Sequence, residues 1–132
     1  MFVTRGSKCF KITSTSSTEI TALQCSQDEA DTCMNLHAAH AAEEFGSVIL
    51  ASDDTDVLII AMAMQSRIPA NLYIRCGNTN TTRIIAVQSL FMTAGREICS
   101  ALPGMHAFTG CDSVSAFSGQ GKLKALNLLR EN

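Results

Sequence analysis

The sequence predicts an α/β domain built around a mostly parallel sheet. Short apolar segments that resemble buried strands alternate along the chain with longer segments in which apolar residues recur every three to four positions, as in helices. Strands that alternate with helices are typical of parallel sheets covered on both faces. The chain has 132 residues, of which 46% are hydrophobic, so one domain with its own core is expected.

The amino-terminal part of the chain predicts a small hairpin. Met1–Thr13 alternates weakly between apolar and polar residues, and Arg5–Ser7 contains a glycine suited to a tight turn. Ser14–Thr18 is predicted to be a polar loop, and Glu19–Cys25 is rich in residues that favour strands.

A helix is predicted between Ser26 and Gly46. Ser26 can cap its start and Gly46 can end it. Its apolar positions, at three-to-four spacing, are Ala30, Cys33, Met34, His37, Ala38, Ala41 and Phe45.

The middle of the chain predicts three strands and a helix. Ser47–Ala51 has the contiguous apolar residues of a short buried strand, and Leu72–Cys76 and Arg83–Ala86 are predicted as further strands. Val57–Gln65 is apolar all round and fits either a strand or a helix, but the aspartates and Thr55 before it favour a helix start.

Three helices are predicted in the carboxy-terminal part. One follows Arg83–Ala86 and runs to about Ala94, and another begins near Pro103, because proline suits the first turn of a helix. The last is predicted over Lys122–Arg130, with leucines along one face.

Charge and hydropathy exclude several classes of function. The chain has 10 basic and 12 acidic residues, so its net charge of -2 gives no general attraction to phosphate or to an anionic membrane. Val57–Met64 is the longest apolar run and is too short to span a bilayer, and the amino terminus lacks the order of a signal peptide. We therefore expect a soluble, intracellular protein with no membrane partner. The nucleus is compatible with the sequence, which specifies neither compartment nor protein partners.

The cysteines predict free thiols. There are six, at irregular spacing and without a C-x-x-C pair. This pattern favours buried free thiols over a disulfide framework or a zinc site.

Acidic residues form the candidate site. The clusters are Glu29 with Asp31, Asp54 with Asp56, and Asp112 in the segment TGCD. Oxygen ligands without a nearby Cys or His pair suit Mg²⁺ or Mn²⁺. Asp54 and Asp56 follow a predicted strand, where sites form in such sheets. Two ions held side by side are typical of phosphodiester hydrolysis, so the acids favour a nuclease.

Each acidic cluster also has a structural interpretation. Ser26–Glu29 matches a capping box, Asp53 or Asp54 could cap the next helix, and Asp112 could be a turn residue. Residues two apart in a helix point roughly 200° apart, so each pair can converge only in a loop or a first turn.

The histidines are not predicted to be metal ligands. His37 and His40 lack acid or thiol partners at the spacing of a transition-metal site. His106 precedes TGCD and could lie near a substrate, but two-metal sites can activate water without a general base.

Taken together and in order, the motifs resemble those of the flap-endonuclease, or XPG-type, nucleases of the PIN-like superfamily. The matching segments are EAD (29–31), SDDTD (52–56) and GCD (110–112), and SGQGKLKALNLL (118–129) resembles the family's helix–two-turn–helix element, which grips a DNA backbone. EADT, DTDV and HAFTGCD are similar to segments of uncharacterised animal proteins with this core, some associated with mobile elements.

The resemblance implies a three-layer PIN-like (5'-3' exonuclease-like) fold, a nucleic-acid partner, which would be DNA, and two Mg²⁺ or Mn²⁺ ions. It implies that the catalytic, metal-binding residues are Glu29, Asp31, Asp54, Asp56 and Asp112, with Asp53 outside the metal shell. The residues implied to hold the nucleic acid are Gly119, Gly121, Lys122 and Lys124. Their type suits this role, since glycines admit a phosphate close to helix-start amides and the lysines add positive charge.

The family also has an earlier strand with a further metal-binding aspartate, for which no counterpart precedes Ser26. We therefore expect a partial nuclease domain that is incomplete at its amino terminus. Its expected parts are strands and a loop (1–25), the acidic core (26–112) and the helix–two-turn–helix-like element (113–132).

Two functions fit the sequence. The first is a metal-dependent, structure-specific nuclease that uses two ions, active or inactive as this portion alone. The second is a non-catalytic nucleic-acid-binding or interaction module with the same fold. An ordinary α/β domain with capped helices would be preferred if the acids lay on different faces.

Overall fold

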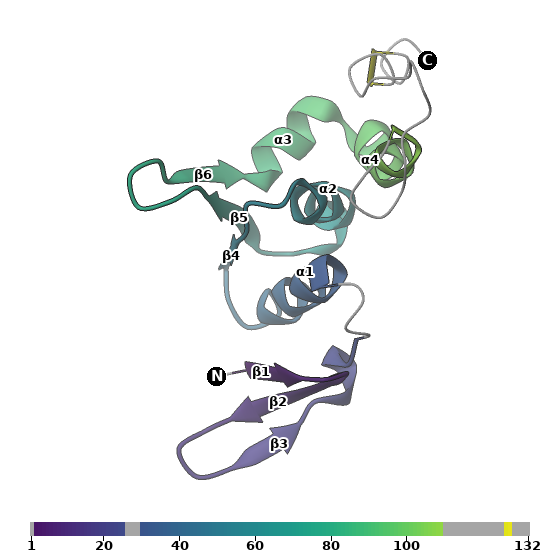
Figure 1. The fold of residues 1–132 in the computed structure, drawn as a ribbon. Helices are drawn as coiled ribbons and strands as arrows, with labels where there is room; N and C mark the ends of the chain where they lie inside the picture. The colour runs from purple at the N-terminus through teal and green to yellow at the C-terminus, as the bar shows by residue number, and fades with distance from the viewer. Residues whose placement is uncertain (1, 26–29, 110–125, 128–132) are drawn as a thin grey trace.

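The computed structural model describes residues 2–25, 30–109 and 126–127 (Figure 1). Within these ranges the fold is mixed α/β, with two three-stranded sheets and four α-helices. None of the helices in these ranges combines the length and the apolar character that a bilayer crossing requires.

The predicted amino-terminal hairpin is confirmed. Strands β1 (Phe2–Arg5) and β2 (Lys8–Ile12) pair in antiparallel register. Gly6 lies in the turn between them at φ 63°, a left-handed conformation that glycine adopts without steric cost.

A third strand begins inside the segment predicted to be a polar loop. The Thr13 amide donates to the Ser16 carbonyl at 2.9 Å and closes a tight turn. The chain can therefore return along β2 as β3 (Ser17–Glu19), before the short 3-10 helix η1 (Thr21–Leu23).

Helix α1 (Ala30–Ala41) lies between the amino-terminal sheet and the second sheet (Figure 1). Its buried residues are Asn35 and Ala38, followed by Ala42 just beyond its end. The predicted extension to Phe45 is wrong, because the α-helix ends earlier and the Phe45 side chain is exposed. The predicted buried face was also incomplete, since a hydrophobic pattern excludes a polar residue such as Asn35.

The second sheet has the order β4-β5-β6 and is mixed. The predicted segments are confirmed as β4 (Ser47–Ala51), β5 (Asn71–Cys76) and β6 (Arg83–Ala86). β4 and β5 are parallel, as expected, and are connected through α2 (Thr55–Met64). β6 is antiparallel to β5 because residues 77–82 form a short hairpin connection, which cannot make a parallel crossover.

Only one face of this sheet is covered within the described ranges. Pairing places Leu50 beside Ile74 on the face that packs against the helices, and both are buried. On the other face Ile49 is 60% exposed and Ile84 is 62% exposed. The expected cover on both faces is therefore not present in this part of the chain.

Helix α3 (Val87–Ala94) agrees with its prediction, but α4 (Arg96–Thr109) starts earlier than expected. Pro103 lies inside α4 rather than in its first turn. Gly95, at φ 87°, turns the chain between the two helices, and its carbonyl accepts a bond from the Cys99 amide at 3.0 Å. The new helix therefore starts at this glycine, and burial of one face of α4 offsets the backbone hydrogen bond that proline cannot donate.

The predicted carboxy-terminal helix, Lys122–Arg130, lies outside the described residues except for Leu126 and Asn127. Both are helical, and Leu126 packs against the hydrophobic core. The core itself joins the buried sheet face to residues from all four helices, which include Ala38, Ala61 and Val87.

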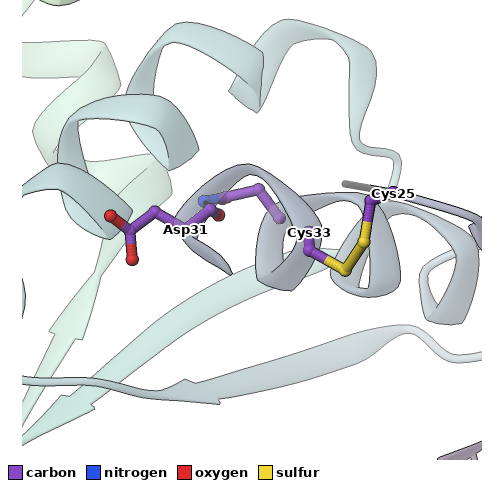
Figure 2. Close-up of a disulfide and its surroundings, with 4 residues drawn as sticks. Cys25, Asp31 and Cys33 are labelled. Carbon is purple, nitrogen blue, oxygen red and sulfur yellow. Dashed lines mark hydrogen bonds between the residues drawn. A yellow bond between two sulfur atoms is a disulfide. The ribbon is translucent and has the colours of Figure 1, made fainter. Parts of the chain in front are cut away.

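The prediction of free thiols is wrong for Cys25 and Cys33, which form a disulfide with their Cα atoms 5.9 Å apart. Cys25 lies just after η1, and Cys33 lies in α1, so the bond joins the end of the amino-terminal sheet region to this helix. Figure 2 shows the disulfide on one side of α1 and the Asp31 carboxylate pointing to the other. Cys9 and Cys99 are buried and free, as predicted, and burial raises the pKa of the Cys99 thiol.

Reducing the disulfide between Cys25 and Cys33 should lower the free energy of unfolding. The bond spans a sequence separation of 8 residues, and closing such a loop in the unfolded chain stabilises a protein by about 2.5 kcal/mol. Urea denaturation with and without reductant measures the difference. The double variant Cys25→Ser, Cys33→Ser should have the same free energy of unfolding as the reduced parent, with or without reductant. A parent whose stability does not change on reduction would contradict the prediction.

Candidate functional site

Three aspartates converge where the first turn of α1 meets the start of α2. One carboxylate oxygen from each of Asp31, Asp54 and Asp56 lies within 4.8 Å of the others. Asp31 is in the first turn of α1, and Asp54 and Asp56 flank Thr55 at the start of α2. The structure therefore brings together three of the five acids predicted to bind metal.

Asp54 and Asp56 can converge because Asp54 is not yet in the helix. Its backbone is extended, with φ -79° and ψ 130°, so the rule that residues two apart diverge does not apply. Its Oδ1 accepts a hydrogen bond from the Asp56 amide at 2.9 Å, so Asp54 is the N-cap of α2. Capping uses Oδ1, and the same carboxylate still contributes to the acidic cluster.

Asp53 makes a different contact. Its Oδ1 accepts a hydrogen bond of 2.5 Å from the amide of Gly77, at the end of β5. Asp53, Arg75 and Gly77 help to line a polar hollow of about 320 Å³, together with Ala51 and Ser52. This hollow lies at the carboxyl ends of the parallel strands β4 and β5. Asp53 is therefore not part of the group formed by Asp31, Asp54 and Asp56.

Asn35 joins the two helices next to the acidic cluster. Its Nδ2 donates to the Asp31 carbonyl at 2.9 Å and to the Val57 carbonyl at 3.2 Å. The side chain is completely buried. Because Val57 directly follows Asp56, this amide links the backbones that carry Asp31 and Asp56.

His106 contacts the cluster from α4. Its Nε2 lies 2.5 Å from Oδ1 of Asp56, and the residue is 6% exposed. The Asp56 carboxylate is half-buried, so the contact is largely shielded from water. His106 is thus in direct contact with a candidate metal ligand, and its proximity to a substrate stays a prediction.

Sequence reasoning missed the roles of Asn35 and His106. A polar residue one helical turn after Asp31 was a local signal for Asn35, because the two side chains lie on the same face of a helix. For His106 the nearby TGCD segment was the only signal. No sequence pattern relates it to Asp56, which lies 50 residues earlier.

The other predicted site residues lie outside the described residues. They are Glu29, Asp112, Gly119, Gly121, Lys122 and Lys124. Their roles as metal ligands and as contacts for nucleic acid stay predictions.

A second, mostly apolar hollow of about 420 Å³ lies between β1 and α1. It is lined by the Cys25–Cys33 disulfide and by His37, among others. Burial, and secondly the charge of His40, lower the pKa of His37. His40 itself packs edge-to-face against Phe2, with ring centroids 5.6 Å apart. These histidines therefore contribute to the contact between the amino-terminal sheet and α1.

No protein-family model, curated protein or solved structure matches the chain. The relationship to PIN-like nucleases, which the motifs suggest, therefore stays a prediction. A functional assignment has to start from the geometry of Asp31, Asp54 and Asp56.

Proposed function

We propose that this chain is a divalent-metal-dependent, structure-specific nuclease-like domain that hydrolyses nucleic-acid phosphodiesters, with DNA as the preferred substrate. The convergence of Asp31, Asp54 and Asp56 from two separate helices is the observation that supports the proposal. We extend it to a PIN-like fold and a two-ion site, in which Glu29 and Asp112 would complete the ligand set.

The three carboxylates fit a hard divalent cation. Oxygen ligands lie about 2.1 Å from Mg²⁺ and about 2.3–2.6 Å from Ca²⁺, so two ligands of one ion are at most about 4–5 Å apart. The oxygens of Asp31, Asp54 and Asp56 lie 4.8 Å or less from one another, which is within the limit of about 5 Å for Ca²⁺ and at most about 0.6 Å beyond the limit of about 4.2 Å for Mg²⁺. An all-oxygen donor set also favours Mg²⁺ or Mn²⁺ over zinc.

Electrostatics gives the cluster a reason to bind a cation. Two unit negative charges separated by 4.8 Å repel by about 1 kcal/mol in water and by roughly 3 kcal/mol at an effective dielectric constant of 20. Asp54 is exposed, whereas Asp31 and Asp56 are half-buried, so the repulsion lies between these limits. A divalent ion would turn this repulsion into attraction.

In the proposed reaction the aspartates bind and orient the ions. Ions of this kind supply activation of water and neutralisation of charge at the phosphodiester. The substrate would be held by local contacts, because the net charge of -2 gives no general attraction to phosphate. We assign these contacts to Gly119, Gly121, Lys122 and Lys124, and Arg75 supplies a positive charge in the polar hollow at the ends of β4 and β5.

A non-catalytic interaction module is the second candidate. The sheet face with Ile49 and Ile84 favours it, because both side chains are exposed among the described residues and exposed apolar surface often marks an interaction site. Such a module would not need the acidic cluster to bind metal.

Mn²⁺ binding measured on the parent, Asp54→Asn and Asp53→Asn tests the metal site on which the nuclease proposal depends. Asparagine caps helices as well as aspartate does, so Asp54→Asn removes a charge from the cluster and preserves the start of α2. Saturating Mn²⁺, at roughly 100 times its Kd, should stabilise the parent by about 2.7 kcal/mol. We expect this stabilisation to fall sharply in Asp54→Asn. It should persist in Asp53→Asn, which makes the same charge change at a residue outside the cluster.

Cleavage is measured on end-labelled single-stranded and flapped DNA, with and without Mn²⁺. The parent and Asp53→Asn should cleave in the presence of Mn²⁺, and Asp54→Asn should cleave much less. The nuclease assignment is wrong if Mn²⁺ leaves the thermal stability of the parent unchanged, or if it stabilises all three proteins equally. Metal binding without cleavage of any labelled substrate would support the non-catalytic module instead.

A further inference from the structure

His106 lies at the contact between α4 and α2, far along the chain from Asp31, Asp54 and Asp56. Its imidazole is almost completely buried, and Nε2 is 2.5 Å from Oδ1 of Asp56. A carboxylate oxygen can only accept, so Nε2 carries the hydrogen and donates it. Nδ1 is buried and has no hydrogen-bond partner among the residues that the structure describes. Asp56 is therefore the polar contact that compensates the burial of this ring.

The contact restrains the carboxylate of Asp56. The terminal torsion of an aspartate has broad minima, so the group would otherwise rotate easily. The bond from His106 holds one oxygen of Asp56 and leaves the second oxygen available to a ligand. Removing a donor that orients a ligating carboxylate in this way typically lowers the metal affinity 10- to 100-fold.

We propose that His106 is a positioning residue of the acidic cluster, which orients Asp56 for binding of the divalent ion. This inference rests on the proposed function, because it requires that Asp31, Asp54 and Asp56 bind metal. A purely structural role, in which His106 only joins α4 to α2, is the alternative.

Mn²⁺ affinity and metal-free stability separate the two roles. Free Mn²⁺ is quantified by electron paramagnetic resonance during titration of the parent and of His106→Leu, His106→Gln and His106→Asn. Unfolding by urea in the presence of EDTA gives the stability of each protein. Gln can place an N–H donor close to the position of Nε2, whereas Leu has no donor and Asn is too short to reach Asp56.

We expect His106→Leu and His106→Asn to bind Mn²⁺ about 10- to 100-fold more weakly than the parent. His106→Gln should stay within about threefold of the parent, because it retains the donor. The packing control is Leu102→Ala, a buried position on the same helix. It should lower stability and leave the Mn²⁺ affinity unchanged.

Three outcomes overturn this inference alone. One is equal affinity in the parent and His106→Leu. Another is a loss of Mn²⁺ affinity in Leu102→Ala as large as that in His106→Leu, which would attribute the effect to packing. If His106→Leu does not fold, the comparison of His106→Gln with His106→Asn decides, and equal affinities of these two variants count against the inference. A parent that does not bind Mn²⁺ overturns the proposed function and this inference together, whereas binding that is insensitive to His106 overturns this inference alone.

Discussion

Asn35→Asp should lower the free energy of unfolding at pH 7 by about 3 kcal/mol or more, since it creates a buried charge without a partner. The change keeps the volume of the side chain but removes both N–H donors. Nδ2 of Asn35 donates to the carbonyls of Asp31 and Val57, so a carboxylate would face two acceptors. Urea denaturation in EDTA, followed by circular dichroism, measures the loss.

The effect of Asn35→Asp should depend on pH. Burial raises the pKa of a carboxyl group, so the folded variant takes up a proton more readily than the unfolded chain does. Stability relative to the parent is therefore best at low pH and is lost as the pH rises through the raised pKa. The deficit should be smaller at about pH 4 than at pH 7.

Asn71→Asp is the matched control for Asn35→Asp, because Asn71 is exposed at the start of β5. It should change stability by less than about 0.5 kcal/mol. Similar losses in the two variants would show that burial between α1 and α2 is not what makes Asn35 important.

Ile74→Ala should cost about 2–5 kcal/mol, the range for truncating a buried isoleucine. Ile74 is 2% exposed and packs in the core from β5. Such a loss is a large share of the roughly 5–15 kcal/mol that stabilises a typical domain. Thermal unfolding should show a decrease in Tm of roughly 10 °C.

Ile84→Ala makes the same change on the opposite face of the sheet, where Ile84 is 62% exposed. The two residues lie on neighbouring strands, since Ile84 pairs with Arg75. Ile84→Ala should change stability by less than about 0.5 kcal/mol. A loss as large as that of Ile74→Ala would show that this face is covered in solution, in conflict with the one-sided core.

The elements with a strong local pattern were predictable from the sequence. β4, β6 and α3 have the predicted boundaries, and α2 differs at its ends only. Continuous β-branched residues, helix-start aspartates and glycine turns act within a few residues, so a local reading captures them. Competition between local signals explains Pro103, where the turn at Gly95 outweighed the preference of proline for a first turn.

Features that depend on distant partners were not predictable in the same way. The way the chain folds back on itself decides the antiparallel direction of β6, the exposure of one sheet face within the described part of the chain, and the bond between Cys25 and Cys33. The hydrophobic pattern of α1 missed Asn35 because the carbonyl of Val57, which helps to satisfy its buried amide, lies 22 residues further along the chain.

The sequence by itself determined the types and order of the central elements, and it placed Asp54 and Asp56 after a strand and Asp31 at a helix start. Only the tertiary structure decided that Asp31 meets Asp54 and Asp56, that Asp53 binds the Gly77 amide instead, and that His106 contacts Asp56. Backbone preferences are local and can be read from neighbouring residues. A side chain's partner depends on the packing of helices from distant parts of the chain, which no short-range pattern encodes.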